Sequence, residues 1–348
     1  MGLLSGLLLA AAAGGAIAQP GGGISWVETF ADDPLAAGRF AVGAGQDGAR
    51  FSYDAVGQFL TVHYDTILPT AWYQRPLDPA GGRVLGRYDD FDFFVTFRIR
   101  SGGFFADPNG FAQIAWGLLS SQTTGEDRAG GSSGPFAFDV VSFDYFPNVT
   151  AFGGPTLGPT VVHGDDGSGF FANIDFTFGA ETDINTTVGD ENLALDVMYT
   201  AHVAYRGADQ TATVMVSGPA MPMLINADGA GGPGGFDGDP TTIQTLAVID
   251  RPFTVDRFAL MAWQDTFSPF GSSIIADVDI HRIAFSAPPV LVGDVNLDGH
   301  IDGMDIEPFV TLLLSGNVDP SLAARGDFDG DGVFDIADRP GFVAALLQ

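Results

Sequence analysis

Short apolar runs, separated by clusters of glycine, aspartate and proline, fill the chain from residue 25 to about residue 287. Many runs alternate apolar and polar residues, which is the period of a strand with one buried face. None keeps a helical period over three turns, so we predict an all-β antiparallel sandwich over residues 25–287. The expected strands are 59–66, 91–100, 111–120, 136–146, 172–178, a hairpin at 200–218, 256–265 and 274–286.

The pattern changes after the two prolines of "SAPPVLV", whose stiff backbone makes residues 288–292 a predicted linker. Residues 309–314 and 342–347 are short amphipathic segments with Phe, Val and Leu on one face. Neither helix can bury its apolar face alone, but each can bury it against the other. We therefore predict a small all-α module of paired loop–helix units at residues 293–348.

The N-terminal segment has an apolar run, Leu3–Ala13, and a small-residue ending, Ala16-Ile17-Ala18. This arrangement predicts a signal peptide, 1–18, removed before Gln19, although no Lys or Arg precedes the run. The alternative is a buried helix. Because no later stretch is long and apolar enough to span a bilayer, this signal peptide predicts a secreted or cell-surface protein.

Composition narrows the function further. The formal net charge of −29 argues against nucleic acid and anionic membranes as partners and favours cations, neutral sugars or basic protein patches. With no cysteine, thiol catalysis, disulfides and cysteine-based zinc sites are excluded.

Two acidic stretches near the end of the chain repeat one pattern: "GDVNLDGHIDGMD", which begins at Gly293, and "GDFDGDGVFDIAD", which begins at Gly326. Side-chain oxygens at loop positions 1, 3, 5 and 12, with the backbone carbonyl of position 7, match what calcium requires, and Gly299 and Gly332 supply the sharp turn. The sequence predicts two calcium ions. The candidate ligand positions are Asp294, Asn296, Asp298, His300 (carbonyl), Asp302 and Asp305, then Asp327, Asp329, Asp331, Val333 (carbonyl), Asp335 and Asp338.

Position 12 is Asp in both loops, where a full EF-hand has Glu, and we expect no entering helix before either loop. In these respects residues 293–348 resemble a type I dockerin, a module that docks on cohesins. The resemblance implies the ligand positions just given and a cohesin-like protein partner. Positions 10 and 11, which choose the partner in that family, are Gly303-Met304 and Ile336-Ala337 rather than a Ser-Thr pair.

Residues 25–287 resemble the concanavalin A-like jelly roll of lectins and glucanases. The features that carry this resemblance are an opening "ETF", the hairpin at 200–218 and a last strand "ADVDIHRIAF". The layout of the whole chain resembles exported proteins of planctomycete-type bacteria.

The sandwich offers no catalytic motif. The E-x-D-x-x-E strand of jelly-roll glucanases is absent, as are G-x-S-x-G and H-E-x-x-H. The sandwich region has four Glu, and no two share a predicted strand: Glu28, Glu126, Glu181 and Glu191. We therefore assign no catalytic residue and no organic cofactor.

Three stretches of the sandwich leave alternatives open. "VVSFDYFPN" resembles a legume-lectin metal strand through Asp144, the Phe146 carbonyl and Asn148, with Ser142 in place of the first acid, but reads equally as a buried strand. Residues 163–171 form a Gly/Asp loop, which would line a site or be a surface turn. Four aromatic residues would form a sugar-stacking platform or pack in the core: Trp72, Tyr73, Trp116 and Trp263.

The favoured interpretation is an exported, non-catalytic protein, in which a sandwich that recognises carbohydrate or another surface ligand is joined to a calcium-stabilised docking module. One alternative is a glycoside hydrolase or polysaccharide lyase on the same fold. Another is a structural cell-surface protein anchored by its tail.

Overall fold

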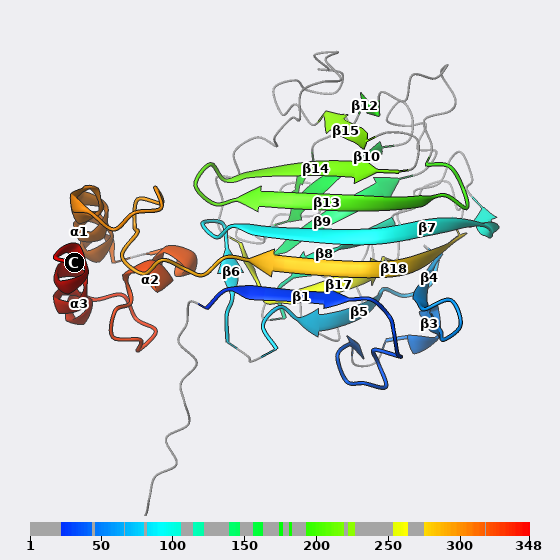
Figure 1. Cartoon of the computed structure of the whole chain (residues 1–348), viewed down its shortest axis with the longest axis horizontal. Helices are drawn as coiled ribbons and strands as arrows, with labels where there is room; N and C mark the ends of the chain where they lie inside the picture. Colours follow the sequence, from blue (N-terminus) through cyan, green and yellow to red (C-terminus); the bar gives the residue numbers. More distant parts are fainter. Residues whose placement is uncertain are drawn as a thin grey trace, which may run out of the picture.

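The computed structural model describes residues 22–43, 46–65, 67–79, 82–105, 114–121, 139–146, 156–162, 174–176, 181–182, 193–218, 222–226, 253–263, 275–316 and 318–348. Within these residues the chain forms two large antiparallel β-sheets packed face to face and a small helical region at the C-terminal end (Figure 1). The predicted antiparallel sandwich is confirmed.

Among the described residues the first sheet has nine strands in the order β12-β15-β14-β13-β7-β18-β4-β3, with β1 also paired to β18. Its strands are β1 (Ile24–Glu28), β3 (Phe51–Asp54), β4 (Phe59–Asp65), β7 (Phe91–Phe105), β12 (Glu181–Thr182), β13 (Met198–Arg206), β14 (Thr211–Ser217), β15 (Pro222–Asn226) and β18 (Ile275–Ala287). The long strand β18 pairs with β4 along its first half and with β1 along its second.

In the part of the chain that the structure describes, the second sheet has seven strands in the order β11-β10-β9-β8-β17-β5-β2. Its strands are β2 (Ala41–Val42), β5 (Ala71–Pro76), β8 (Ile114–Leu119), β9 (Val140–Phe146), β10 (Thr156–Val162), β11 (Ile174–Phe176) and β17 (Arg257–Ala262). Strands β6 (Leu85–Gly86) and β16 (Thr254–Val255) form a separate two-stranded ladder, and the short 3-10 helix η1 covers Gly48–Arg50.

The core lies between the two large sheets and is built from alternate residues of each strand. On β7, Phe93, Val95 and Phe97 are fully buried, whereas Asp92 and Thr96 lie on the other face. This alternation is the sequence pattern that predicted the strands. Strands are found within each of the eight predicted segments, including the hairpin of β13 and β14.

Two of the four candidate aromatics belong to this core, so for them the core-packing alternative holds and the sugar-platform alternative is wrong. Trp116 is fully buried and stacks on Phe143, and Tyr73 stacks on Phe40 between the sheets. Both side chains are on the inward-facing register of their strands, β8 and β5. They are therefore unable to present a ring to a ligand.

The tail contains helices α1 (Ile306–Ser315), α2 (Pro320–Gly326) and α3 (Arg339–Leu346), with 3-10 turns η3 (Gly303–Asp305) and η4 (Ile336–Asp338) closing the loops. Helices α1 and α3 confirm the two amphipathic segments. The expectation that no helix enters either loop is wrong for the second loop, because α2 leads directly into Asp327. Helix α2 begins with a proline in its first turn and is capped by the Asp319 carboxylate, which accepts the Ser321 N–H.

The tail has its own apolar cluster of Val295, Phe309 and Phe342, and it lies at one end of the sandwich with α2 nearest the sheets (Figure 1). The chain reaches it from β18 through the two prolines, and the side chain of Arg83 holds the Pro288 carbonyl at 2.6 Å. Among the described residues no helix is long and apolar enough to cross a bilayer.

Candidate metal centre in the C-terminal loops

The two acidic loops share one backbone conformation. Gly299 and Gly332 both have φ of +84°, the left-handed region that glycine adopts at least cost. Two positions earlier, Leu297 has φ of +66° and Gly330 has φ of +75°. A non-glycine residue therefore takes the left-handed conformation in the first loop where the second uses glycine, so the turn is imposed by the loop as a whole.

The last acid of each loop holds its frame together. Asp305 is fully buried, and its carboxylate accepts the N–H groups of Val295 at 2.8 Å, Asn296 at 3.1 Å and Asp302 at 2.9 Å. Such charged hydrogen bonds are stronger than neutral ones, so this carboxylate fixes the start of the loop against its end.

The second loop repeats these contacts around Asp338, which is 1% exposed. Its carboxylate accepts the N–H groups of Phe328 at 2.7 Å, Asp329 at 3.3 Å and Asp335 at 2.8 Å. Equivalent residues of the two loops thus make equivalent bonds. The sequence repeat is a repeat of geometry.

Carboxylate oxygens converge in the second loop, and a buried one has no partner among the described residues in the first. In the second loop, carboxylate oxygens of Asp327, Asp329 and Asp338 all lie within 4.8 Å of one another. In the first loop, Asp294 is 4% exposed, and its Oδ1 atom has no hydrogen-bond partner within the described part of the chain. A buried carboxylate oxygen without a partner is costly, and a cation at this point would remove the cost.

The electrostatics of the first loop also favour a cation. Burial raises the pKa of Asp294, and the nearby carboxylates of Asp305 and Asp298 raise it further against the opposing effects of the Gly299 N–H and Arg325. The segment 293–348 contains ten Asp and one Glu against two Arg. The donor set, hard oxygen atoms in a glycine-turned loop, fits calcium and offers no soft ligand for a transition metal.

The other predicted ligand positions have distinct places. Asp302 and Asp335 cap the 3-10 turns, where they accept the N–H groups of Met304 at 2.7 Å and Ala337 at 2.6 Å. Asp298 and Asp331 accept the N–H groups of residues 300 and 333 at 2.9 and 2.8 Å. Asn296 donates its amide N–H to Asp298 at 2.9 Å. His300 and Val333 have exposed side chains, consistent with a role for their backbones alone.

Sequence reasoning missed Arg325, which lies 4.0 Å from Asp294. It sits on α2, beyond the whole of the first loop and α1, so no local spacing pointed to it. The only available signal was that it is one of two arginines in a tail that has no lysine.

A second group of residues lies on the face of the seven-stranded sheet turned away from the main core. Trp72 and Trp263 meet edge to face with ring centroids 5.9 Å apart, beside Met261 and Ala259. Trp72 is fully buried, whereas Trp263 is half-buried, so Trp263 alone of the four candidate aromatics keeps part of its side chain at the surface. Both indole N–H groups and the Oε1 atom of Gln74 have no hydrogen-bond partner in the part of the chain that the structure describes.

The remaining sandwich hypotheses fall mainly outside the described residues. The side chains of Asp144, Phe146 and Glu181, and all of Asn148, residues 163–171, Glu126 and Glu191, lie outside them. Glu28 is described: it is buried, and its carboxylate pairs with Arg39 at 2.7 Å and accepts the Phe30 N–H at 2.8 Å. These contacts give Glu28 a structural role.

No protein-family model matches the chain, and no curated protein matches it. Among solved structures, the chain is similar to the lectin from Bauhinia forficata in complex with GalNAc, with 13% identity, a TM-score of 0.41 and coverage of 77% of this chain and 99% of that one. It is also similar to peanut lectin with a 9-mer peptide, with 12% identity, a TM-score of 0.39 and coverage of 77% and 98%. Lectin II from Ulex europaeus has 13% identity, a TM-score of 0.39 and coverage of 76% and 98%.

Proposed function

We propose that this protein is an exported, non-catalytic binding protein. Its C-terminal module holds two calcium ions and docks on a protein partner, and its sandwich recognises carbohydrate. The observation that carries the proposal is the pair of acidic loops, which repeat the same frame and leave a buried oxygen of Asp294 without a partner among the described residues.

In each loop the cation would be held by the oxygens at positions 1, 3, 5 and 12 and by the backbone carbonyl of position 7. Calcium there would neutralise the acidic loops and so stabilise the packing of α1 on α3. Titration of the full chain with calcium, followed by circular dichroism, tests this. We expect a gain in helical signal that chelator reverses, whereas no change up to millimolar calcium would contradict it.

The docking role is supported by an exposed apolar surface that follows the same repeat. Val310 and Val343 are 44% and 47% exposed, and Leu314 and Leu347 are 80% and 82% exposed. The members of each pair occupy the same position in the two repeats, so the two units present equivalent apolar side chains to solvent. Such exposed apolar side chains favour a protein partner of the cohesin-like class.

Carbohydrate recognition is supported by Trp263, which packs on Trp72 close to the surface of the seven-stranded sheet. An indole face packs on the apolar face of a sugar ring, and Trp263 keeps part of its side chain at the surface. The sandwich architecture is also one that lectin domains use.

A panel of plant, algal and microbial polysaccharides, tested with the full chain in calcium and in chelator, separates the alternatives. We expect binding without release of reducing ends or unsaturated sugars. Binding should be weaker for Trp263→Ala than for the control Val56→Ala, whose side chain is 97% exposed. Turnover above a buffer control would favour the hydrolase or lyase. Self-assembly without sugar binding would favour a structural surface protein.

Export is supported by the apolar run and small-residue ending of residues 1–18. N-terminal sequencing of the chain recovered outside a bacterial host tests it. A mature chain that begins at Gln19 would support export, and a chain retained inside the cell with its first residues intact would contradict it.

A further inference from the structure

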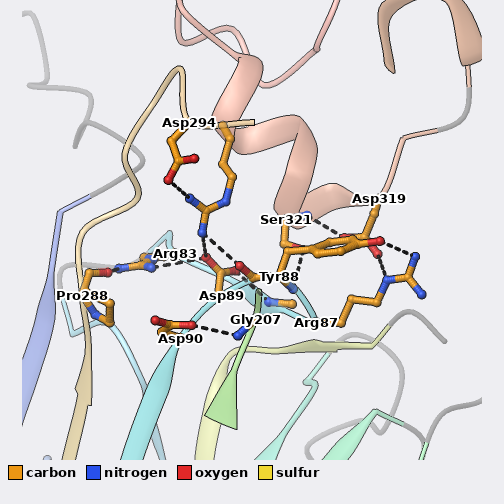
Figure 2. A network of polar contacts seen from close by, with 12 residues as sticks. Arg83, Arg87, Tyr88, Asp89, Asp90, Gly207, Pro288, Asp294, Asp319 and Ser321 are labelled. Atoms are coloured by element: carbon orange, nitrogen blue, oxygen red, sulfur yellow. Dashed lines mark hydrogen bonds and ion pairs between the residues drawn. The ribbon is translucent and has the colours of Figure 1, made fainter. Parts of the chain in front are cut away.

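The calcium-loop module lies against the sandwich through α2 and the turn at residues 86–89, which we call the docking turn. The Tyr88 N–H donates to Ser321 Oγ at 3.3 Å (Figure 2), and Arg325 Nη2 donates to the Tyr88 carbonyl at 2.9 Å. A Cβ atom on Gly86 would come within 2.7 Å of the Ser321 side chain. Only glycine at position 86 therefore lets α2 approach this closely.

The docking turn is fixed to the sandwich. Asp89, 2% exposed, accepts the Gly86 N–H at 2.9 Å and pairs with Arg83 at 3.4 Å. Tyr205, in β13, donates its hydroxyl to the Arg87 carbonyl at 2.7 Å. Across the interface, Arg87 of the docking turn pairs with Asp319 at the start of α2, at 3.2 Å (Figure 2). Any movement of the tail away from this turn breaks several of these bonds together.

Arg325 joins this interface to the first calcium loop. Its guanidinium lies between two carboxylates, with Nη1 4.0 Å from Asp294 Oδ2 and Nη2 4.0 Å from Asp89 Oδ1. Its backbone carbonyl accepts the N–H of Gly293, the residue before Asp294, at 2.8 Å. One residue thus contacts the sandwich and the first ligand position of the loop.

We propose that Arg325 couples calcium binding in the first loop to the seating of the tail, by which we mean the packing of α2 against the docking turn of the sandwich. This inference rests on the calcium binding proposed above. In the seated tail, the Tyr88 carbonyl and Asp89 hold the guanidinium and keep it from closing on Asp294. In a tail that leaves the sandwich, the guanidinium is free to pair fully with Asp294 and competes with the cation. Seating therefore favours calcium, and by reciprocity calcium favours seating.

The test changes the sandwich and measures calcium in the tail. Gly86→Ala places a methyl group against Ser321, at a position far from every candidate calcium ligand in the sequence. We expect it to weaken one of the two calcium sites by about fivefold or more, the lower end of measured couplings between sites. The matched control is Gly102→Ala, where a Cβ meets nothing within 4 Å. It should leave both sites unchanged.

Removing the Arg325 guanidinium, which competes with calcium for Asp294, should restore the affinity that Gly86→Ala lowers. In the double variant Gly86→Ala with Arg325→Ala, the affinity of the weakened site should return to at least that of the parent. If the parent binds no calcium, the proposed function fails and the coupling fails with it. If the parent binds two ions and Gly86→Ala behaves as Gly102→Ala does, only the coupling is overturned. If the loss persists in the double variant, Arg325 is not the coupling residue and the proposal is overturned.

A second readout does not depend on Gly86. Because the chain has no cysteine, Val27→Cys and Leu314→Cys, at positions 51% and 80% exposed, place spin labels only on β1 and α1. Calcium should narrow the distance distribution measured by pulsed electron paramagnetic resonance. Arg325→Ala should broaden it even with calcium, whereas Arg339→Ala, on the exposed start of α3, should not. A distribution that neither calcium nor Arg325→Ala alters would overturn the proposal.

Discussion

The rings of Phe309 and Phe342 stack face to face, with centroids 3.9 Å apart and planes 1° from parallel. Each phenylalanine occupies the same place after the first aspartate of its loop, Asp294 or Asp327. Because the two loop–helix units share one spacing, equivalent residues meet where the units pack together. The two loop–helix units of the tail thus meet at an aromatic pair formed by equivalent residues.

We predict that Phe342→Ala destabilises the tail by about 3 kcal/mol, the cost of removing a buried aromatic ring from a packed core. Thermal unfolding of the full chain, followed by near-ultraviolet circular dichroism and calorimetry, measures it. The control is Leu347→Ala at the exposed end of α3, where the change should stay within about 0.5 kcal/mol. Equal losses in the two variants would show that the stacked pair does not hold the units together.

Asp305→Ala should open the first loop selectively. It removes three hydrogen bonds to a buried carboxylate, so we expect a loss of about 3 kcal/mol in the free energy of opening that loop. Amide hydrogen exchange should accelerate at Val295, Asn296 and Asp302. The second loop, held by Asp338, supplies the internal comparison: its amides should keep most of their protection. Uniform acceleration in both loops would contradict the view that each loop has its own frame.

How much of this was readable from the sequence depends on the range of the contacts involved. The repeated loop geometry was readable because all the candidate ligand positions of each repeat lie within one short loop. Helix α2 was missed because its sequence, "PSLAARG", shows no apolar period and is stabilised by a cap and by contact with the sandwich. Tyr73 and Trp116 face the main core, whereas Trp72 faces away from it. Which face a side chain takes depends on the register of its strand in the sheet, and that register is set by contacts between residues far apart in the sequence.

Arg50 ties the two sheets of the sandwich together. Its guanidinium donates to the carbonyls of His63 at 3.1 Å, Asp65 at 2.9 Å and Pro69 at 2.6 Å on one side, and of Ala262, at the end of β17, at 3.2 Å on the other. Arg50→Met would remove all four of these hydrogen bonds.

We therefore predict that Arg50→Met destabilises the sandwich by about 3 kcal/mol or more. Denaturant unfolding followed by tryptophan fluorescence measures this, since the four tryptophans all lie outside the tail. Arg339→Met, in the exposed start of α3, is the matched control. An unfolding midpoint unchanged by Arg50→Met would mean that water replaces the hydrogen bonds of the guanidinium without any loss of stability.

His281 should make the sandwich less stable in mild acid. Burial lowers the pKa of its imidazole, and Arg98 and Arg100 lower it further against the opposing effect of Asp279. A histidine with a lowered folded pKa takes up its proton more readily in the unfolded chain. Stability is therefore fully present above the unfolded pKa of about 6.5 and falls as the pH drops toward the folded pKa.

Denaturant unfolding of the sandwich between about pH 7.5 and pH 5 tests this sign. His281→Leu should flatten the decline below about pH 6.5, because it removes the group that protonates on unfolding. A variant as sensitive to acid as the parent would assign the decline to other groups.

Isothermal titration calorimetry of the full chain with calcium, after exhaustive chelation, tests the central claim most directly. The two loops predict two ions per chain in the parent. The double variant Asp294→Ala with Asp327→Ala should bind none, because each change removes the first ligand of one loop. No binding by the parent, or two ions still bound by the double variant, would contradict the account.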